Sequence, residues 1–302
     1  MLQVLLSGLA IGGVYGLVAL GFAIAFYVTR VINFAQGQLL MVAVMVTAAL
    51  STTGLPTWLA ALAGLVGSAA LGVLMYFVAV GPVLAYDRFS FAWLVSTLGV
   101  AIVLETGAAI IWGPTSRAFP AMLNNNTVHV GTGSLTLQQL LTVVVALLAV
   151  AGFELVRRFT LFGKLGMAIS ADPEMARAVG SNTRLAAGVA FGVAGLLAGV
   201  AGVLIGPITF ANPYLGDTYG IAGFVALMIG GIERPAGAMA GGFILGLLDE
   251  GANHFINSHA SDWFPFVVVV AVLLLAPRGL FSSGEVLRRL RRTTTPMAEG
   301  TS

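Results

Sequence analysis

The sequence predicts an all-α membrane protein, a polytopic bundle of about eight or nine transmembrane helices. Of the 302 residues, 58% are hydrophobic and only 9% are charged, whereas soluble domains carry about 25% charged residues. Apolar runs near the ~20 residues that span a bilayer recur along almost the whole chain. These runs are continuous, whereas the strands of a transmembrane barrel alternate over segments of about ten residues. A helical bundle is therefore expected.

Polar breaks divide the apolar runs into the expected helices. In chain order they cover approximately residues 4–28, 35–51, 57–81, 91–112, 137–156, 185–207, 219–231, 236–250 and 264–281. The seventh and eighth runs are shorter than a full span, so they are either half-helices or one interrupted element. No basic segment precedes the first run, which predicts a retained transmembrane helix rather than a cleaved signal peptide. We expect a transmembrane domain over 1–284 and a basic tail over 285–302.

The basic residues gather on one side of this predicted bundle. If the nine segments alternate across the membrane, thirteen of the fourteen Lys and Arg residues fall on one side, and only Arg117 lies opposite. Most of them lie in the loop 157–184 and near the C-terminus. Because cytoplasmic loops are enriched in Lys and Arg, we expect a cytoplasmic C-terminus and an N-terminus outside. The Arg-rich tail would then lie near anionic membrane lipid.

Glycines form stripes at helical spacing. The chain has 39 glycines, nearly twice the average share. The stripes are Gly8, Gly12 and Gly16; Gly188, Gly192, Gly195, Gly199, Gly202 and Gly206; and Gly237, Gly241, Gly242 and Gly246. Small residues let helix backbones approach closely in lipid. We expect tight packing within the chain, with a dimer interface as the alternative.

The residue types argue against a metal centre or an enzyme. There is no cysteine, hence no disulfide or thiolate site, and the histidines (His129, His254 and His259) lie in predicted loops. A membrane enzyme would need a cluster of catalytic groups. The nearest candidates, Asp249 and Glu250 beside His254, are expected to form a solvated helix end. We therefore expect no catalytic residue, no bound metal and no nucleic-acid partner.

The stretch RVINFAQGQLL, residues 30–40, interrupts the apolar N-terminal region. Arg30 is the only charged residue among the first fifty. The other polar side chains, with one glycine among them, are Asn33, Gln36, Gly37 and Gln38. One reading is a cytoplasmic turn between two spans. The other is a break at membrane depth, whose amides satisfy freed backbone groups and line a solute path, because irregular backbone there must be buried or line a cavity.

Two further features bear on such a path. Glu105 is the only acid well inside a predicted span, and it makes either an interior structural contact or a pathway or gate contact. The sequence also contains a weak internal repeat. Ile32 and Gly37 recur as Ile232 and Gly237, and each pair lies in a polar or glycine-rich break. Transporters often contain repeats whose broken helices meet near the binding site. The second break adds the path candidates Gly231, Glu233, Pro235 and Gly237.

The loop 157–184 contains a well-capped short helix within SADPEMARAVGSN. Asp172 is a good N-cap, Pro173 suits the first helical position and Gly180 is a natural stop. A helix over about 173–179 is expected. Within it, Ala176 shares a face with Val179, and Glu174 can pair with Arg177. The helix is either a plain loop helix or an element that docks into a partner's groove.

These residues resemble a known family. Glu174, Ala176 and Gly180 have the spacing E-x-A-x-x-x-G, which resembles the loop by which ABC importer permeases dock on their ATPases. VINFAQGQLLM resembles the INFAHGE segment of branched-chain amino acid permease subunits. Three more stretches are similar to family segments in the same order: ANPYLG, IGGIERPAGAMAGGFILG and APRGLF. The resemblance to branched-chain amino acid ABC transporter permeases covers residues 5–284.

The resemblance implies a division of labour in the bacterial inner membrane. This chain would supply half of the path, and a second permease subunit, homologous or identical, the other half. Two cytoplasmic ATPases would bind the coupling loops, and an external binding protein would deliver the solute. The ATPases would bind ATP and Mg, and this chain no cofactor; FGKLG lacks the spacing of a phosphate-binding loop. The implied solutes are leucine, isoleucine and valine, with urea, short amides or aromatic acids as alternatives.

The chain also departs from the family. Gln36 stands where the family usually has His, so a titratable role at that position is lost. Glu233 and Arg234 occupy positions that are often small or polar, and they could form an ion pair at a broken helix. An ion-coupled secondary transporter is the competing function. It needs titratable groups within the spans, and Glu105 stands nearly alone there, which argues against proton coupling.

Overall fold

The computed structural model describes residues 1–86, 91–119, 127–130, 133–232, 234–255 and 260–275. The predicted all-α class is confirmed, and each predicted apolar segment lies on a helix as far as its residues are described, the last one only up to residue 275. The helices are α1 Leu2–Thr29, α2 Gln36–Thr52, α3 Thr57–Met75, α4 Gly81–Tyr86, α5 Ala92–Trp112, α6 Leu137–Phe159, α7 Leu161–Ala171, α8 Pro173–Ala178, α9 Thr183–Thr209, α10 Leu215–Gly230, α11 Pro235–Phe255 and α12 Ala260–Leu275. A π-helical turn, Tyr76–Val80, joins α3 to α4.

Five helices among the described residues are long and apolar enough to cross a membrane. They are α1, the continuous Thr57–Tyr86 element, α5, α6 and α9. A sixth candidate is the pair α10 and α11, which bends by 117° between its two halves. The shorter apolar helices are α2 and the Trp263–Val272 part of α12. The seventh and eighth predicted runs thus lie on two helices joined by a sharp bend.

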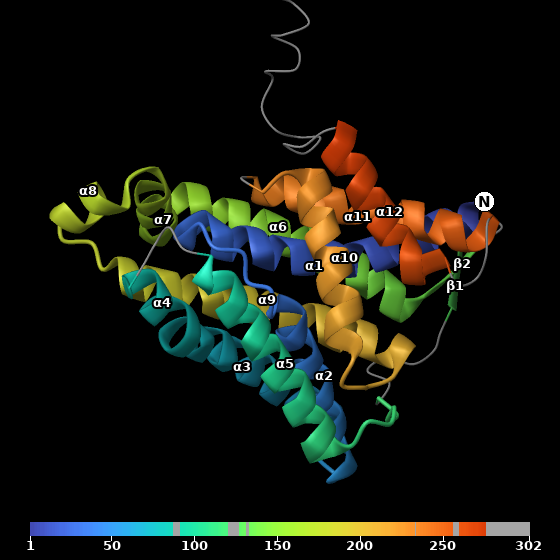
Figure 1. Cartoon of the computed structure of the whole chain (residues 1–302). Coiled ribbons are helices and arrows are strands. Elements are labelled where there is room, and N and C mark those ends of the chain that lie inside the picture. The colour runs from blue at the N-terminus through green and yellow to red at the C-terminus, as the bar shows by residue number, and fades with distance from the viewer. Residues whose placement is uncertain (87–90, 120–126, 131–132, 233, 256–259, 276–302) are drawn as a thin grey trace, which may run out of the picture.

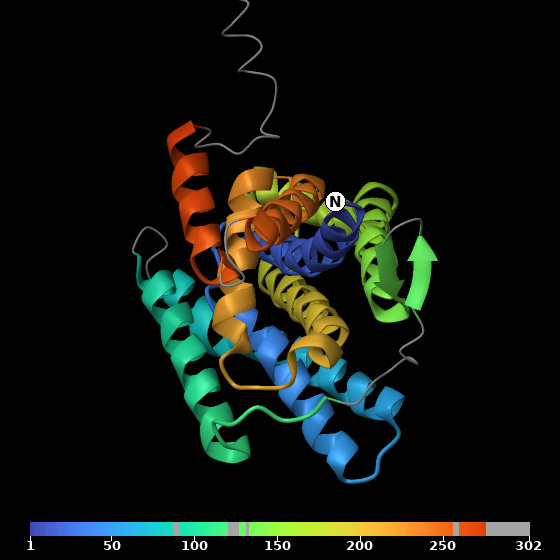
Figure 2. The ribbon, with the colours of Figure 1, turned by 90° about the vertical axis from the view of Figure 1, so that its right-hand side faces the viewer.

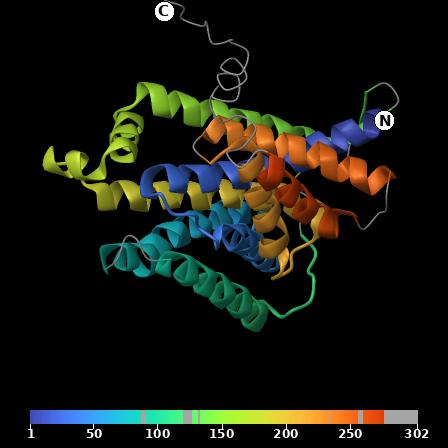
Figure 3. The same ribbon diagram turned by 45° about the horizontal axis from the view of Figure 1, so that its top comes forward.

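Helix α1 forms the centre of the bundle. It packs against α11, α9, α10 and α6, and Figure 3 shows α6 and α11 along one side of α1 with α9 along the other. Most of α1 and α9 is buried. By contrast, α5 and α6 lie at the periphery on opposite flanks (Figure 2) and expose mainly apolar side chains. Such a surface is suited to lipid or to another membrane subunit.

The glycine stripes pack within the chain. A Cβ at Gly12 would lie 2.8 Å from the Phe243 Cα, and a Cβ at Gly242 would collide with the Gly16 backbone. Gly8 faces Gly246 and Leu247 in the same way, so α1 and α11 run antiparallel in close contact. The α9 stripe packs on α3, where a Cβ at Gly195 would lie 2.5 Å from the Ser68 carbonyl oxygen. Intramolecular packing therefore accounts for these stripes.

A short β-hairpin was not predicted. Strands β1 (Thr127–Val130) and β2 (Gly133–Thr136) pair antiparallel, and the Ser134 amide donates to the Gln3 side-chain oxygen at 2.8 Å. The hairpin therefore sits beside the start of α1. His129 lies on β1 and His254 in the last turn of α11, so the expectation that both lie in loops was wrong.

The two ends of the bundle differ. Arg30, just after α1, donates to the Ser170 carbonyl oxygen at 3.0 Å and to its hydroxyl at 3.2 Å, which places it beside α7. Figure 1 shows α7 and α8 at the end of the molecule opposite the N-terminus and the hairpin. Arg30 and the basic segment 157–184 thus share one end, as predicted. The basic tail 285–302 lies outside the described residues.

Candidate translocation site and coupling segment

The chain turns back into the bundle after α1. Arg30 ends that helix in the left-handed conformation, with φ 60°. The first residue of α2, Gln36, donates from Nε2 to the Ala194 carbonyl oxygen at 2.8 Å, and a Cβ at Gly21 would collide with this same nitrogen. Gly21 lies eight residues before Thr29 on α1, a distance of about 12 Å at 1.5 Å per residue. Helix α2 therefore begins inside the bundle, well below the end of α1.

Two amide side chains satisfy the backbone in this break. Asn33 accepts a hydrogen bond from the Ala35 amide at 3.0 Å, and its Nδ2 donates to Gln36 Oε1 at 3.4 Å. Both Asn33 and Gln36 are fully buried. Buried backbone groups outside regular structure need such partners. The amides thus make the irregular segment 31–35 tolerable at this depth.

Gly37 brings α2 and α10 into direct backbone contact. A Cβ there would collide with the Gly216 carbonyl oxygen and lie 2.7 Å from the Gly220 Cα. The facing Gly216 has no room either, because its Cβ would meet the Gln38 amide. Two glycines on α10 and one on α2 therefore set this contact, which fixes the position of Gln38.

Gln38 links two carboxylates from other helices. Its Nε2 donates to Asp217 Oδ1 on α10 at 2.8 Å and lies 3.5 Å from Glu105 Oε2 on α5. Gln38 is buried, Glu105 is partly buried and Asp217 is exposed. The Gln38 oxygen is buried without a hydrogen-bond partner in the described part of the chain. Glu105 is therefore not isolated. Its neighbour Asp217 was missed because it lies in the loop before the predicted run 219–231, whereas α10 already begins at Leu215.

The second break lies between α10 and α11. Gly231 has φ 92°, which favours glycine, and Pro235 begins α11. A Cβ at Gly237 would collide with the Gly230 carbonyl oxygen, so the helices cross closely here. Glu233 lies outside the described residues, and with it the predicted Glu233–Arg234 ion pair.

The two breaks lie at a similar depth. Helix α11 runs antiparallel to α1, with Met239 against Gly16. Helix α11 starts four residues before Met239, so its start lies level with about Leu20 of α1. The start of α2 lies beside Gly21, the next residue of α1. Phe34, in the first break, contacts Phe224 of α10, with 5.7 Å between the ring centroids. The first and second breaks, which the weak internal repeat relates, thus lie close to each other beside α10.

Asp249 corrects a prediction. Its side chain is 1% exposed and accepts a hydrogen bond from the Tyr15 hydroxyl at 2.8 Å. The expected solvated helix end was wrong, because α11 continues to Phe255 and turns Asp249 towards α1. Glu105 is therefore not the only acid within a span. Tyr15 also packs on Tyr219 of α10, with the rings 6.0 Å apart.

The short helix α8 has the caps that the sequence predicts. The Asp172 carboxylate accepts from the Glu174 amide at 2.9 Å and from the Met175 amide at 3.0 Å. Gly180 has φ 85°, and the Ser181 amide returns to the Ala176 carbonyl oxygen at 3.0 Å. The helix spans Pro173–Ala178, one residue shorter than expected.

The faces of α8 differ from the prediction. Ala176 is buried, but Val179 follows the helix and is 75% exposed, so the two do not share a face. The Arg177 Nε donates to the Thr183 hydroxyl at 3.1 Å, and in the described part of the chain Arg177 does not pair with Glu174. The exposed surface of α8 is formed by Glu174, Met175 and Arg177. An apolar and charged tip of this kind suits contact with another protein.

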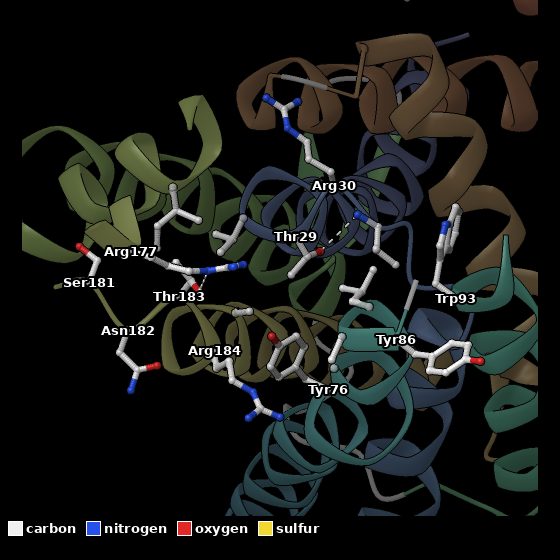
Figure 4. Close-up of a pocket in the computed structure, with 17 residues that line it drawn as sticks. Thr29, Arg30, Tyr76, Tyr86, Trp93, Arg177, Ser181, Asn182, Thr183 and Arg184 are labelled. Carbon is white, nitrogen blue, oxygen red and sulfur yellow. Dashed lines mark hydrogen bonds between the residues drawn. The ribbon is translucent and has the colours of Figure 1, made fainter. Parts of the chain in front are cut away.

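A cavity of about 880 Å³ adjoins this segment. It lies between the end of α1, the π-helical turn with α4, the start of α5 and the α8–α9 connection (Figure 4). Arg30, Arg177 and Arg184 line it. Among the described path candidates, Asn33, Gln36, Gln38 and Glu105 do not line it, so the cavity is separate from them. Sequence reasoning gave no indication of it.

The fold and the buried groups define a class of protein. It is a helical membrane protein with interrupted helices that carry amides and carboxylates into the bundle, which is the organisation of a transporter. Residues 4–276 match the family described as the branched-chain amino acid transport system permease component. The chain belongs to this family.

Curated relatives cover nearly the whole chain. The high-affinity branched-chain amino acid transport system permease protein LivH of Escherichia coli is 32% identical over 94% of this chain and 96% of its own length. BraD, the corresponding permease protein of Pseudomonas aeruginosa, is 29% identical over 94% and 97%. A probable LivH of Methanocaldococcus jannaschii is 27% identical over 91% and 90%. No solved structure matches the chain.

Proposed function

We propose that this permease is one subunit of an ATP-driven importer in the bacterial inner membrane. The observation that carries the proposal is α8, a short capped helix at one end of the bundle. Its E-x-A-x-x-x-G residues resemble the docking loop of ABC importer permeases. Its exposed side chains, among them Glu174 and Met175, are available to a groove on a cytoplasmic ATPase. The ATPase, and not this chain, binds ATP and Mg.

The proposed orientation puts α8 and the C-terminus in the cytoplasm and the N-terminus outside. The support is the common end shared by Arg30 and the segment 157–184, because Lys and Arg favour the cytoplasmic side. The chain has no cysteine, so a Ser181→Cys variant carries a single thiol. That thiol should resist membrane-impermeant reagents added to intact cells and react after lysis. Labelling in intact cells would reverse the orientation.

The proposed path runs past the two breaks. Gln38 places its amide beside the Glu105 and Asp217 carboxylates. Asn33 and Gln36 add two linked amides in the same break, and such polar groups suit a small polar solute. A second permease subunit, homologous or identical, completes the path, and an external binding protein delivers the solute. The relatives named above make leucine, isoleucine and valine the proposed solutes. Urea, short amides and aromatic acids are the alternatives.

Paired variants separate the path from the docking element. Asn33→Ala and Gln36→Ala should lower ATP-driven uptake while the ATPase still co-purifies. Glu174→Ala should lose or uncouple the ATPase, whereas Lys164→Gln, an exposed change on the neighbouring α7, should not. Uptake that persists after ATPase depletion and follows a proton gradient would instead establish an ion-coupled transporter. Normal uptake in both amide variants would remove the first break from the path.

The solute is tested through the binding protein. The extracytoplasmic protein that co-purifies with the importer should bind leucine, isoleucine or valine in calorimetry. Binding of urea, a short amide or an aromatic acid in place of these would change the solute while leaving the importer assignment intact. This separates the two parts of the proposal.

A further inference from the structure

Two carboxylates of the candidate path share one amide and have no basic partner. An oxygen of Glu105 lies 3.5 Å from Nε2 of Gln38, and an oxygen of Asp217 lies 2.8 Å from the same nitrogen. In the described part of the chain, neither carboxylate forms an ion pair with Lys, Arg or His. Charges within a bilayer are costly when they are unpaired, and they mark solute or ion pathways.

Helix ends offset only part of this negative charge. Asp217 lies in the first turn of α10, where the partial positive charge of the helix N-terminus favours an acid. Glu105 lies well beyond the first turn of α5, which begins at Ala92, so its charge gains nothing from that helix. A proton shared by the two acids would balance one charge and leave the other. The subunit by itself therefore does not neutralise the pair.

The oxygen of Gln38 is an independent sign of a binding site. Gln38 is 2% exposed, and its Oε1 has no hydrogen-bond partner in the described part of the chain. A buried acceptor without a donor is costly, and such groups are rare in folded proteins. The nitrogen of the same amide lies between the two carboxylates. Because the two ends of an amide have nearly the same shape, a half-turn would place the oxygen there instead.

These three side chains suit an ammonium group. An ammonium carries one positive charge and three N–H donors, which match two carboxylates and one amide oxygen. Asp217 is exposed and Glu105 is only partly buried, so a solute can reach them from the surface of the subunit. Urea and short amides bring no charge to the pair, and a solute whose only charge is a carboxylate would be repelled.

We propose that Glu105, Asp217 and Gln38 form an ammonium subsite, which holds the α-ammonium group of an amino acid during its passage through the permease. The inference rests on the proposed function, because it assigns one group of the solute to the proposed path. It also selects among the proposed solutes. Leucine, isoleucine and valine carry the required group, whereas urea, short amides and aromatic acids without an amino group do not.

The test uses the importer complex in phosphatidylcholine nanodiscs without the binding protein, so that the binding protein cannot select the ligand. Three probes share one carbon skeleton and differ in charge: isopentylamine, isovaleramide and isovalerate. Titrations followed by saturation-transfer NMR should show saturable binding of isopentylamine, which is leucine without its carboxylate. The neutral amide and the anion should not bind.

Variants of the subsite locate the bound amine. Glu105→Gln keeps an acceptor for Gln38 but removes the charge, and it should weaken amine binding about tenfold, the effect of losing one charged hydrogen bond. Asp217→Asn should act in the same way. The control is Glu250→Gln, which removes a partly buried carboxylate from α11 and should bind the amine like the parent. Thermal unfolding checks the fold of each variant, and Glu105→Asp, which keeps the charge, should recover part of the binding.

Three results would overturn the subsite. Equal amine binding in Glu105→Gln and in the parent would remove Glu105 from it. Saturable binding of isovaleramide or isovalerate would mean a neutral or anionic solute. Displacement of the amine by millimolar Na⁺ or K⁺ would mean a site for an inorganic cation, as an ion-coupled transporter needs.

A separate measurement keeps the subsite and the proposed function apart. Uptake of radiolabelled leucine by proteoliposomes, with the ATPases and the binding protein present, should depend on ATP. Amine binding without ATP-driven uptake would remove the importer assignment and leave the subsite in place. ATP-driven uptake without amine binding would remove the subsite alone.

Discussion

The contact between α2 and α10 gives the sharpest test of the architecture around the first break. In Gly37→Ala, the added methyl group would collide with the Gly216 carbonyl oxygen and lie 2.7 Å from the Gly220 Cα. Carbon atoms pack best at about 3.5–4.0 Å, so relieving the Gly220 contact alone needs about 1 Å, and relieving the closer contact with the Gly216 oxygen needs more. Forced separations of this kind cost about 1–3 kcal/mol, partly offset by the ~0.5–1 kcal/mol that alanine gains over glycine in a helix.

A matched control is available on α3. Gly67 is also helical, and a Cβ there would meet nothing within 4 Å. Gly67→Ala therefore carries the helix gain without the collision and should be neutral or slightly stabilised. In detergent, tryptophan fluorescence during heating should place the midpoint of Gly37→Ala below that of Gly67→Ala by a few degrees, at about 2–4 °C per kcal/mol. Equal midpoints, or a more stable Gly37→Ala, would refute the backbone contact and the placement of Gln38 that depends on it.

Three other changes test separate contacts. Tyr15→Phe removes the hydrogen bond to buried Asp249 and should lower stability by about 1–3 kcal/mol, with unchanged thermal unfolding as the contrary outcome. Asp172→Ala removes the N-cap of α8 and should cost about 1 kcal/mol. Amide hydrogen exchange should then become faster in α8 but not in α9; an equal increase in both helices would contradict this. Ser68→Ala removes the contacts of its hydroxyl with the Leu39 and Gly195 carbonyl oxygens at 2.9 and 2.6 Å and should cost roughly 0.6 kcal/mol, a typical value between membrane helices. The control is Ser51→Ala, whose partly buried hydroxyl bonds within α2 to the Thr47 carbonyl oxygen; a larger loss in this control would argue against the contact between helices.

The fold class could be predicted because lipid imposes it. Every backbone group in the hydrocarbon layer must be paired within the chain, so apolar runs of the right length become helices. The caps of α8 were equally readable, because Asp172 and Gly180 act on their own neighbours in sequence. These signals act between neighbours in the sequence, so they can be recognised without knowing which helices pack together.

Contacts between distant segments could not be predicted. Asp249 looked like the end of a solvated helix, yet it meets Tyr15 more than two hundred residues away. Asp217 falls in a loop before the predicted run 219–231, but α10 begins earlier and carries it to Gln38. Both positions depend on which helices are neighbours. The hairpin at 127–136 depends in the same way on the Gln3 side chain at the start of α1.

The amides at the first break pair with buried backbone groups without bringing a charge into the bundle. The Gln36 oxygen accepts from Asn33, and its amide nitrogen donates to the Ala194 carbonyl oxygen. A neutral histidine would also offer one acceptor and one donor. A protonated histidine would lose the acceptor, whereas Gln36 keeps both bonds at any pH. The break in this chain is therefore built to hold its shape without titrating.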